Sequence, residues 1–172
     1  MAISSKKTRI QTSLFSIGII IGFILFILSG QYFEQDKLGY LKKIGAITLL
    51  FAGYFMFVPF ISLSKFGESE KGKSYMDTSK IAQKGVYAIV RHPQYLGYML
   101  LIAGFSCIYQ NIISATIGLF IIVLLFLFTM HEEKLLENNF GEEYIQYKKQ
   151  VPQFNFIWGL VKYVVLKNNK KM

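Results

Sequence analysis

Charged side chains are scarce in this chain. Asp, Glu, Lys and Arg make up 17% of its 172 residues, whereas hydrophobic residues make up 53% and aromatic residues 16%. Soluble domains carry about 25% charged residues. The composition therefore excludes an ordinary soluble domain and places the chain in a lipid bilayer.

The chain has a single cysteine and lacks the usual nucleotide-binding and metal-binding motifs. Cys107 is the single cysteine, so an internal disulfide is excluded. The chain contains neither Gly-x-x-x-x-Gly-Lys-Ser/Thr nor Gly-x-Gly-x-x-Gly, which excludes a conventional phosphate loop and a Rossmann site. His131-Glu132-Glu133 falls short of the zinc motif His-Glu-x-x-His because Leu135 takes the place of the second His. We therefore expect no metal.

Acidic residues are fewer than basic ones, and the formal net charge is +9. Such an excess could indicate nucleic acid as a partner, but the basic residues lie between apolar runs rather than along one amphipathic face. They have the distribution of a membrane topology signal. We expect the bilayer, and not nucleic acid, to be the partner.

Four uncharged runs come near the roughly 20 residues that cross about 30 Å of hydrocarbon. The third run has fourteen residues and is the shortest, and only Gln110 and Asn111 separate it from the fourth, so these two should form a tight antiparallel hairpin buried against the first pair. The predicted fold is all-α and polytopic, with about four transmembrane helices and cytosolic C-terminal helices. The runs are Leu14 to Gly30, Ile44 to Leu63, Leu96 to Tyr109 and Ile112 to Met130.

The positions of the basic residues predict the orientation. With both termini in the cytoplasm, sixteen of the nineteen Lys and Arg residues are cytoplasmic. We therefore expect a multi-pass protein of the cell membrane with both ends inside. The N-terminal run is longer than the apolar part of a usual signal peptide and has no evident cleavage site near Gly30, so we interpret it as a retained anchor.

Helical signals continue after the fourth run. Leu135, Leu136 and Phe140 keep helical spacing, and Gly141 provides a stop. A helix over Glu142 to Gln150 is predicted because acids occupy its first turn and lysines its last. The aromatic-rich stretch that follows Pro152 is suited to the membrane interface and could cover a site.

The segment Arg91-His92-Pro93-Gln94-Tyr95 allows two interpretations. These residues are common at the ends of membrane helices, as a snorkelling Arg, a helix-starting Pro and an interfacial Tyr. Alternatively, Pro93 opens a helix whose free amide groups bind an anion, with His92 and Tyr95 as additional donors.

Glu132 and Glu133 directly follow the fourth run. Two adjacent carboxylates near a membrane repel each other and require a cation. Lys134 and Arg91 could supply it, or a cationic ligand could. Both clusters lie at one interface, where a small cofactor with a carboxylate, an ammonium and an aromatic base would suit them, with Tyr87 and Tyr95 available for contacts.

Three motifs in this order resemble the isoprenylcysteine carboxyl methyltransferases and the related phospholipid methyltransferases. They are Gly85-Val86-Tyr87 through Gly97, then Glu132-Glu133, then Phe140-Gly141-Glu142-Glu143-Tyr144 through Pro152. The resemblance covers about residues 81–159. It implies an integral membrane enzyme that uses S-adenosylmethionine on the cytosolic side to methylate a lipophilic substrate entering from the bilayer.

The resemblance also implies roles for individual residues. His92, Pro93, Gln94 and Tyr95 would line the cofactor pocket, Ile81, Ala82 and Tyr87 would flank it, and Glu132 would hold the polar end of the cofactor.

We expect the chain to be one membrane domain over residues 1–172. It would contain a scaffold pair of helices in 14–63, packed through Gly18, Gly22, Gly45 and Gly53, and a cofactor-binding and catalytic half in 81–166.

One position departs from that pattern. Eukaryotic members that methylate prenylated cysteine have an Arg shortly before the Glu pair, and Phe128 stands at the matching position here. The resemblance therefore leaves the methyl acceptor and the catalytic residue unassigned. Two alternatives remain, namely an NADPH-dependent membrane reductase of the sterol type, which shares Arg-His-Pro-x-Tyr-x-Gly, and a non-catalytic lipid-binding membrane protein.

Overall fold

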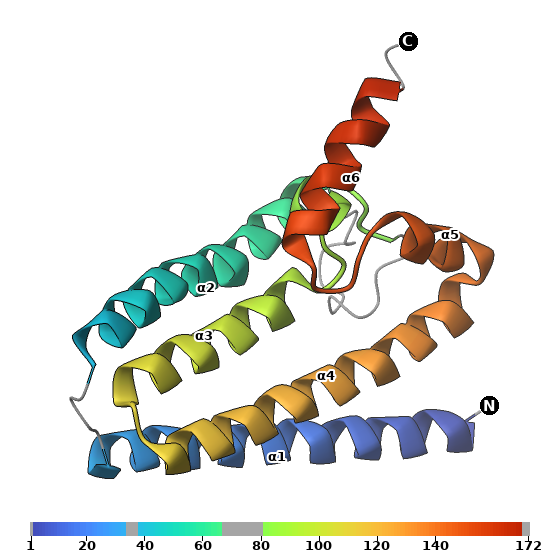
Figure 1. Cartoon of the computed structure of the whole chain (residues 1–172). Helices are drawn as coiled ribbons and strands as arrows, with labels where there is room; N and C mark the ends of the chain where they lie inside the picture. The colour runs from blue at the N-terminus through green and yellow to red at the C-terminus, as the bar shows by residue number, and fades with distance from the viewer. Residues whose placement is uncertain (1, 34–37, 67–80, 170–172) are drawn as a thin grey trace. The chain divides into compact units, whose positions relative to one another are not determined.

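The computed structural model describes residues 2–33, 38–66 and 81–169 (Figure 1). Regular structure in these ranges is helical and includes no strand, which confirms the predicted all-α class. The elements are α1 (Ala2–Phe33), α2 (Gly39–Phe66), the short 3-10 helix η2 (Gly85–Ala88), α3 (Pro93–Tyr109), α4 (Ile112–Phe140), α5 (Glu142–Gln150) and α6 (Phe156–Asn169).

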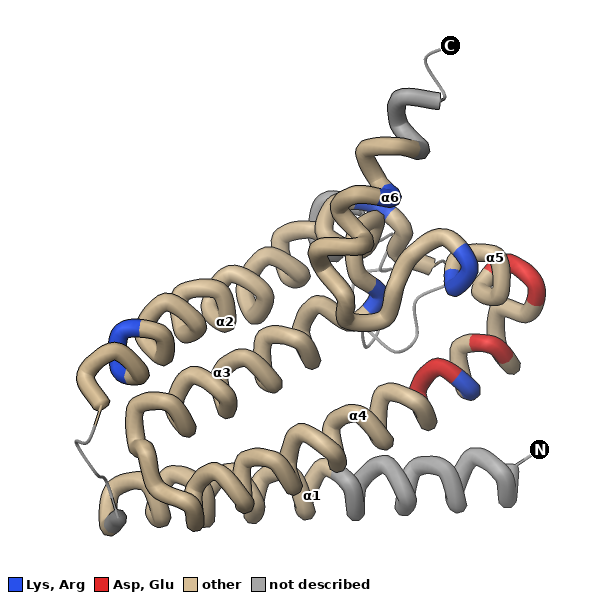
Figure 2. The backbone as a smooth tube through the Cα atoms, viewed as in Figure 1, with Lys and Arg blue, Asp and Glu red and all other residues tan. Residues whose placement is uncertain are grey.

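Each of the four uncharged runs forms a helix. Within the described ranges, Gly39–Ser62 and Ile112–Phe140 are long and apolar enough to cross a membrane, and Ser16–Tyr32 and Phe156–Val165 are shorter apolar helices. Charged residues gather near the helix ends and leave the middle of α2 and the first part of α4 uncharged (Figure 2). The count of four membrane crossings stays a prediction.

The chain divides into two compact units. The first unit contains residues 1–51 and 99–130, and the second contains residues 52–98 and 131–172. All residues of the Arg-His-Pro and Glu-Glu motifs fall in the second unit. The predicted division into a scaffold over 14–63 and a catalytic half over 81–166 remains untested.

In the first unit, α1 packs against α4. The fully buried Phe26 of α1 lies near Gly118 of α4, and the hydroxyl oxygens of Ser29 and Ser114 lie 2.9 Å apart. A Cβ atom added to Gly22 would lie 3.1 Å from the side chain of Ile121, so Gly22 stands at this contact as predicted.

Small residues also bring α2 and α3 together. A Cβ atom on Gly45 would lie 2.6 Å from the carbonyl oxygen of Gly104, so the two backbones approach closely there. The prediction was wrong for Gly18 and Gly53, because no atom of the described residues lies within 4 Å of a Cβ atom at either position. Both of these glycines face away from neighbouring helices.

The α3–α4 hairpin has the tight connection that the sequence predicts. The side chain of Asn111 accepts a hydrogen bond of 2.7 Å from the backbone N–H of Ser114, which caps the start of α4. The side-chain amide of Gln110 exchanges two hydrogen bonds, of 2.8 and 3.0 Å, with the backbone of Leu38. Close contact of Gly118 with Ile102 shows that the two helices lie side by side.

In the second unit, α5 packs on the segment that leads into η2. The chain turns at Gly141, where φ is 55°, and α5 then begins with Glu142 and Glu143 as predicted. Its buried face forms the hydrophobic cluster Tyr144, Tyr147 and Val151, against which Ile81, Leu136 and Phe140 pack. This cluster holds α5 beside the C-terminal end of α4, where the Glu pair lies.

Candidate functional site

The Arg-His-Pro segment is fixed first by its backbone. The N–H groups of Arg91 and His92 donate to the carbonyl oxygens of Pro152 and Gln153 at 3.0 and 3.3 Å. Pro93 then opens α3, where the missing proline N–H costs no hydrogen bond, and the carbonyl of His92 accepts the first helical bond, from Leu96. The loop between α5 and α6 therefore lies directly against this segment.

The guanidinium of Arg91 joins α4 to the end of α5. Its Nε donates to Glu133 Oε1 at 2.8 Å, and one terminal nitrogen lies 2.7 Å from the same oxygen. The other terminal nitrogen donates to the carbonyl oxygens of Lys148 and Val151. These carbonyls belong to the C-terminal turn of α5, where a cation is favourable. Arg91 is thus a buried structural cation.

Glu133 is compensated by three cationic or donor groups. Besides Arg91, His92 Nε2 lies 3.2 Å from Oε1, and the ammonium of Lys148 lies 3.1 Å from Oε2. Lys148 also pairs with Glu137, and hydrogen bonds to Glu137 and then to Glu133 raise its pKa. The sequence alternative that paired the glutamates with Arg91 is confirmed for Glu133, and Lys148 supplies the second cation in place of Lys134.

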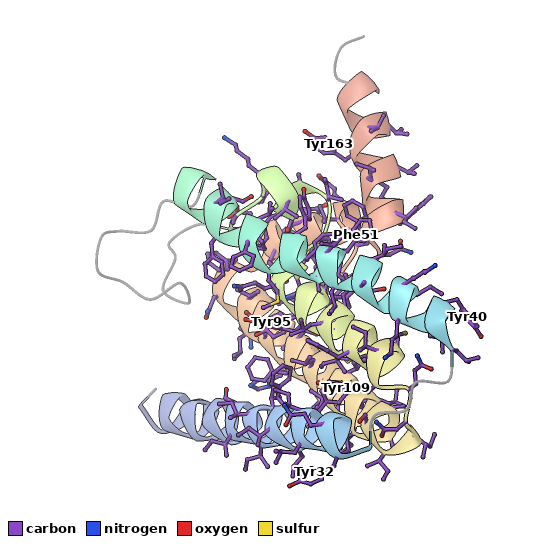
Figure 3. All side chains as sticks on the ribbon, turned by 90° about the vertical axis from the view of Figure 1, so that its left-hand side faces the viewer. Tyr32, Tyr40, Phe51, Tyr95, Tyr109 and Tyr163 are labelled. Atoms are coloured by element: carbon purple, nitrogen blue, oxygen red, sulfur yellow. The ribbon has the colours of Figure 1, made fainter. Side chains whose placement is uncertain are left out.

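Glu132 has a different environment. Its Oε2 is buried and has no hydrogen-bond partner among the described residues, and it lies 3.9 Å from His92 Nδ1. The phenol of Tyr95, labelled in Figure 3, hydrogen-bonds the Glu132 carboxylate. Burial, together with the charge of Glu132, raises the pKa of Tyr87 to about 12. The Tyr87 phenol therefore stays protonated at neutral pH and can donate.

The His92 ring lies between the two carboxylates. Its Nε2 is 3.2 Å from Glu133 Oε1, and its Nδ1 is 3.9 Å from Glu132 Oε2, beyond hydrogen-bond distance. Glu132 Oε2 is therefore a buried acceptor without a hydrogen-bond partner among the described residues. A buried acceptor without a partner costs about 1 to 3 kcal/mol, and more when it is charged. The arrangement favours a ligand that brings a hydrogen-bond donor or a positive charge.

The structure brings four of the residues singled out in the sequence together: His92, Tyr95, Tyr87 and Glu132. Ile81 packs on the Tyr144 and Tyr147 cluster instead. The remaining three are Ala82, which is half-buried beside Ile81, Pro93, which is fully buried, and Gln94, which is half-buried on the first turn of α3.

Sequence reasoning missed Lys148, Tyr144 and Tyr147 as parts of this region. The Tyr147 hydroxyl donates to the carbonyl oxygen of Tyr87 at 2.7 Å and so holds η2 in place. The helical spacing of Tyr144, Tyr147 and Val151 could have indicated a buried face of α5. Across the described ranges, no group of three or more His, Cys, Asp or Glu side chains could hold a metal ion.

Comparison with known proteins identifies the family. The sequence pattern of the phospholipid methyltransferases matches residues 41–143, which is more than half of the chain. The chain belongs to this family. The matched range includes the Arg-His-Pro segment and both glutamates. No solved structure matches the chain.

Similar curated proteins include protein-S-isoprenylcysteine O-methyltransferases. The protein of that name from Schizosaccharomyces pombe is 34% identical over 94 residues, which cover 53% of this chain and 37% of the relative. The one from Rattus norvegicus is 28% identical over 144 residues, or 80% of this chain and 49% of the relative. Protein B of that name from Arabidopsis thaliana is 36% identical over 75 residues, 42% and 38% of the two chains. The chain thus spans about half or less of the length of these relatives.

Proposed function

We propose that this chain is an S-adenosylmethionine-dependent methyltransferase that acts on a lipophilic substrate at the cytosolic face of a membrane. The observation that carries the proposal is the buried, unpartnered Oε2 of Glu132 beside His92, while the neighbouring Glu133 is fully engaged. Membership of the phospholipid methyltransferase family supports the reaction class.

The donor set of the site fits this cofactor. S-adenosylmethionine carries an ammonium and ribose hydroxyls, which are hydrogen-bond donors of the kind that Glu132 Oε2 lacks. Tyr87 and Tyr95 add phenol groups and ring surface beside them. By the family resemblance, Pro93 and Gln94 line the pocket and Ile81 and Ala82 flank it.

When bound, the sulfonium of this cofactor supplies an activated methyl group, so the protein needs mainly to align the reactants and exclude water. Glu132 holds a donor of the cofactor, and Glu133 fixes the His92 ring through Nε2. Arg91 joins the end of α5 to α4 beside the site. We assign no general base, and the proposal requires no metal.

For the methyl acceptor we propose a chemical class and not a single molecule. The similar proteins are named for isoprenylcysteine. By the family resemblance, eukaryotic members that methylate prenylated cysteine have an Arg at the position of the buried Phe128. Without that cation, recognition of a prenylcysteine carboxylate has no evident partner at this position. We therefore propose an isoprenylcysteine-like molecule or another lipid that enters from the bilayer.

The proposed site requires a particular placement in the membrane. With both termini in the cytoplasm and about four crossings, the start of α3 and the end of α4 emerge on the cytoplasmic side. The apolar helices that the structure contains support membrane insertion. The cell membrane as the location and the multi-pass topology belong to the proposal.

The test measures thermal unfolding of the detergent-purified chain with S-adenosylhomocysteine. At about 100 times Kd, such a ligand stabilises the folded state by about 2.7 kcal/mol, which raises the unfolding midpoint by several degrees. Glu132→Gln should weaken binding about tenfold or more because a charge-assisted hydrogen bond is lost. Glu142→Gln is the matched control and should bind normally, because the exposed Glu142 carboxylate accepts a hydrogen bond from Gln146 in its own helix.

A second ligand locates the contact. 5′-Methylthioadenosine lacks the amino-acid part of S-adenosylhomocysteine, so Glu132→Gln should leave its binding unchanged if Glu132 holds the ammonium.

Stabilisation by NADPH in place of S-adenosylhomocysteine would establish the reductase alternative. Absence of any shift with saturating S-adenosylhomocysteine would favour a non-catalytic lipid-binding protein. Transfer of a labelled methyl group to a membrane extract would then identify the acceptor.

A further inference from the structure

The C-terminal helix α6 is anchored through its first turn and through Lys162, whose ammonium donates to the carbonyl oxygen of Lys149 at 3.2 Å. The side chain of Asn155 accepts a hydrogen bond of 3.0 Å from the N–H of Trp158, and the ring of Phe156 packs edge-on against Phe55 at 5.1 Å. Gly159 lies so close to Ile89 that an added Cβ atom would be 1.8 Å from its carbonyl oxygen. This turn is therefore fixed in the second unit.

The large apolar side chains of α6 from Ile157 to Val165 are exposed. Ile157 is 76% exposed and the only tryptophan of the chain, Trp158, is 52% exposed. Side chains project from more than one side of the helix, that of Tyr163 among them (Figure 3). The other exposed members are Leu160, Val161, Val164 and Val165. Water is an unfavourable environment for such a surface, which requires a partner.

The length of the apolar part excludes a crossing helix. Phe156–Val165 has ten residues, which is about 15 Å of helix and half of a hydrocarbon core about 30 Å thick. A helix of this kind can instead lie at the boundary between headgroups and acyl chains. Trp158 and Lys162 support that depth, because the ammonium lies 5.8 Å from the ring centre and both residue types favour the interface.

The charge of the C-terminal part identifies the partner. No acidic residue follows Glu143. Besides Lys148, which pairs with Glu133 and Glu137, five lysines follow it, at positions 149, 162, 167, 170 and 171. A second copy of the chain would bring these like charges together. Anionic headgroups complement them, and each lysine near such a surface contributes about 1 kcal/mol.

We propose that α6 lies in the interface of a leaflet that contains anionic lipid, with its apolar side chains among the acyl chains and its lysines at the phosphates. The connection from α5 to α6 is hydrogen-bonded to the backbone of Arg91 and His92. Only the short loop between α5 and α6 therefore separates the lipid-contacting helix from the candidate site. This inference stands independently of the methyltransferase proposal.

Trp158 reports the position of α6 without any label, because the chain has no other tryptophan. The full chain is reconstituted in vesicles of phosphatidylcholine with or without phosphatidylglycerol, using lipids brominated near the headgroup end or near the methyl end of the acyl chain. We expect blue-shifted Trp158 emission that resists acrylamide and is quenched more by the shallow bromines. Phosphatidylglycerol should strengthen this quenching.

Two variant pairs separate the charge of α6 from general effects. Lys162→Gln with Lys167→Gln should weaken the dependence on phosphatidylglycerol, whereas Lys42→Gln with Lys43→Gln, which lie in α2, should leave it unchanged. Emission quenched by acrylamide and insensitive to bromine would overturn the proposal. So would protection of Trp158 that depends on the protein-to-lipid ratio, which would indicate a second copy. No methyl donor is needed, so the outcome is independent of catalysis.

Discussion

Glu132 and Glu133 are neighbours in the sequence but have different surroundings in the structure. Successive residues of an α-helix point about 100° apart, so α4 directs the two carboxylates to different partners. Glu133 meets Arg91, His92 and Lys148, whereas Glu132 lies near His92 and Tyr95 with one oxygen unpartnered. Glu133 is a positioning residue for His92, and Glu132 remains available for a ligand.

At this scale, we predict that Glu133→Leu destabilises the protein by about 3 kcal/mol, because it leaves Arg91 buried without its counter-ion. Glu133→Leu combined with Arg91→Met should cost clearly less than the sum of the two single changes. Unfolding of detergent-solubilised protein by heat or denaturant measures both effects. Additive losses would show that this pair is not coupled, and the exposed Glu142→Gln should change stability by less than about 0.5 kcal/mol.

At the scale of elements, the position of α6 depends on the close approach of Gly159 to the segment before Arg91. Gly159 leaves no space for a side chain against the Ile89 carbonyl. We predict that Gly159→Ala lowers stability by about 1 to 3 kcal/mol, since backbone atoms must shift to admit the methyl group. The thermal midpoint and the Trp158 emission of the folded protein both report this change.

For Gly53→Ala in α2 we predict the opposite effect, an increase in stability. Within the part of the chain that the structure describes, no atom lies within 4 Å of a Cβ atom there, so the change should stabilise the helix by about 0.5 to 1 kcal/mol. If Gly159→Ala were as well tolerated as Gly53→Ala, the contact between α6 and Ile89 would not be a packing constraint.

For the whole molecule, the distribution of lysine and arginine predicts both termini in the cytoplasm. With Cys107 replaced by Ser, a cysteine at Leu38 should react with an impermeant maleimide on intact cells. A cysteine at Lys84 should react only after permeabilisation. Both positions are exposed in the structure, so burial does not explain a difference. The reverse pattern would place the candidate site outside the cell and contradict the proposed use of a cytosolic methyl donor.

Local signals allowed the sequence to predict the helices and several of their ends. Uncharged runs with flanking charges indicated α1 to α4, Pro93 indicated the start of α3, and Gly141 indicated the break before α5. Prediction was poorer for packing between helices. Gly45 stands at a helix contact, but Gly18 and Gly53 do not, because the sequence does not state which side of a helix meets a neighbour.

Composition, apolar runs and short-range helix signals determined by themselves that this protein is an all-helical chain suited to a membrane, and the spaced motifs indicated its family. The tertiary structure decided which of the two adjacent glutamates forms ion pairs with Arg91 and Lys148. It also decided which one has, among the described residues, a carboxylate oxygen without a hydrogen-bond partner beside His92. Helix formation depends on neighbours along the chain, whereas ion pairing depends on side-chain directions and on residues from α4, α5 and the start of α3 that only folding brings within a few ångströms.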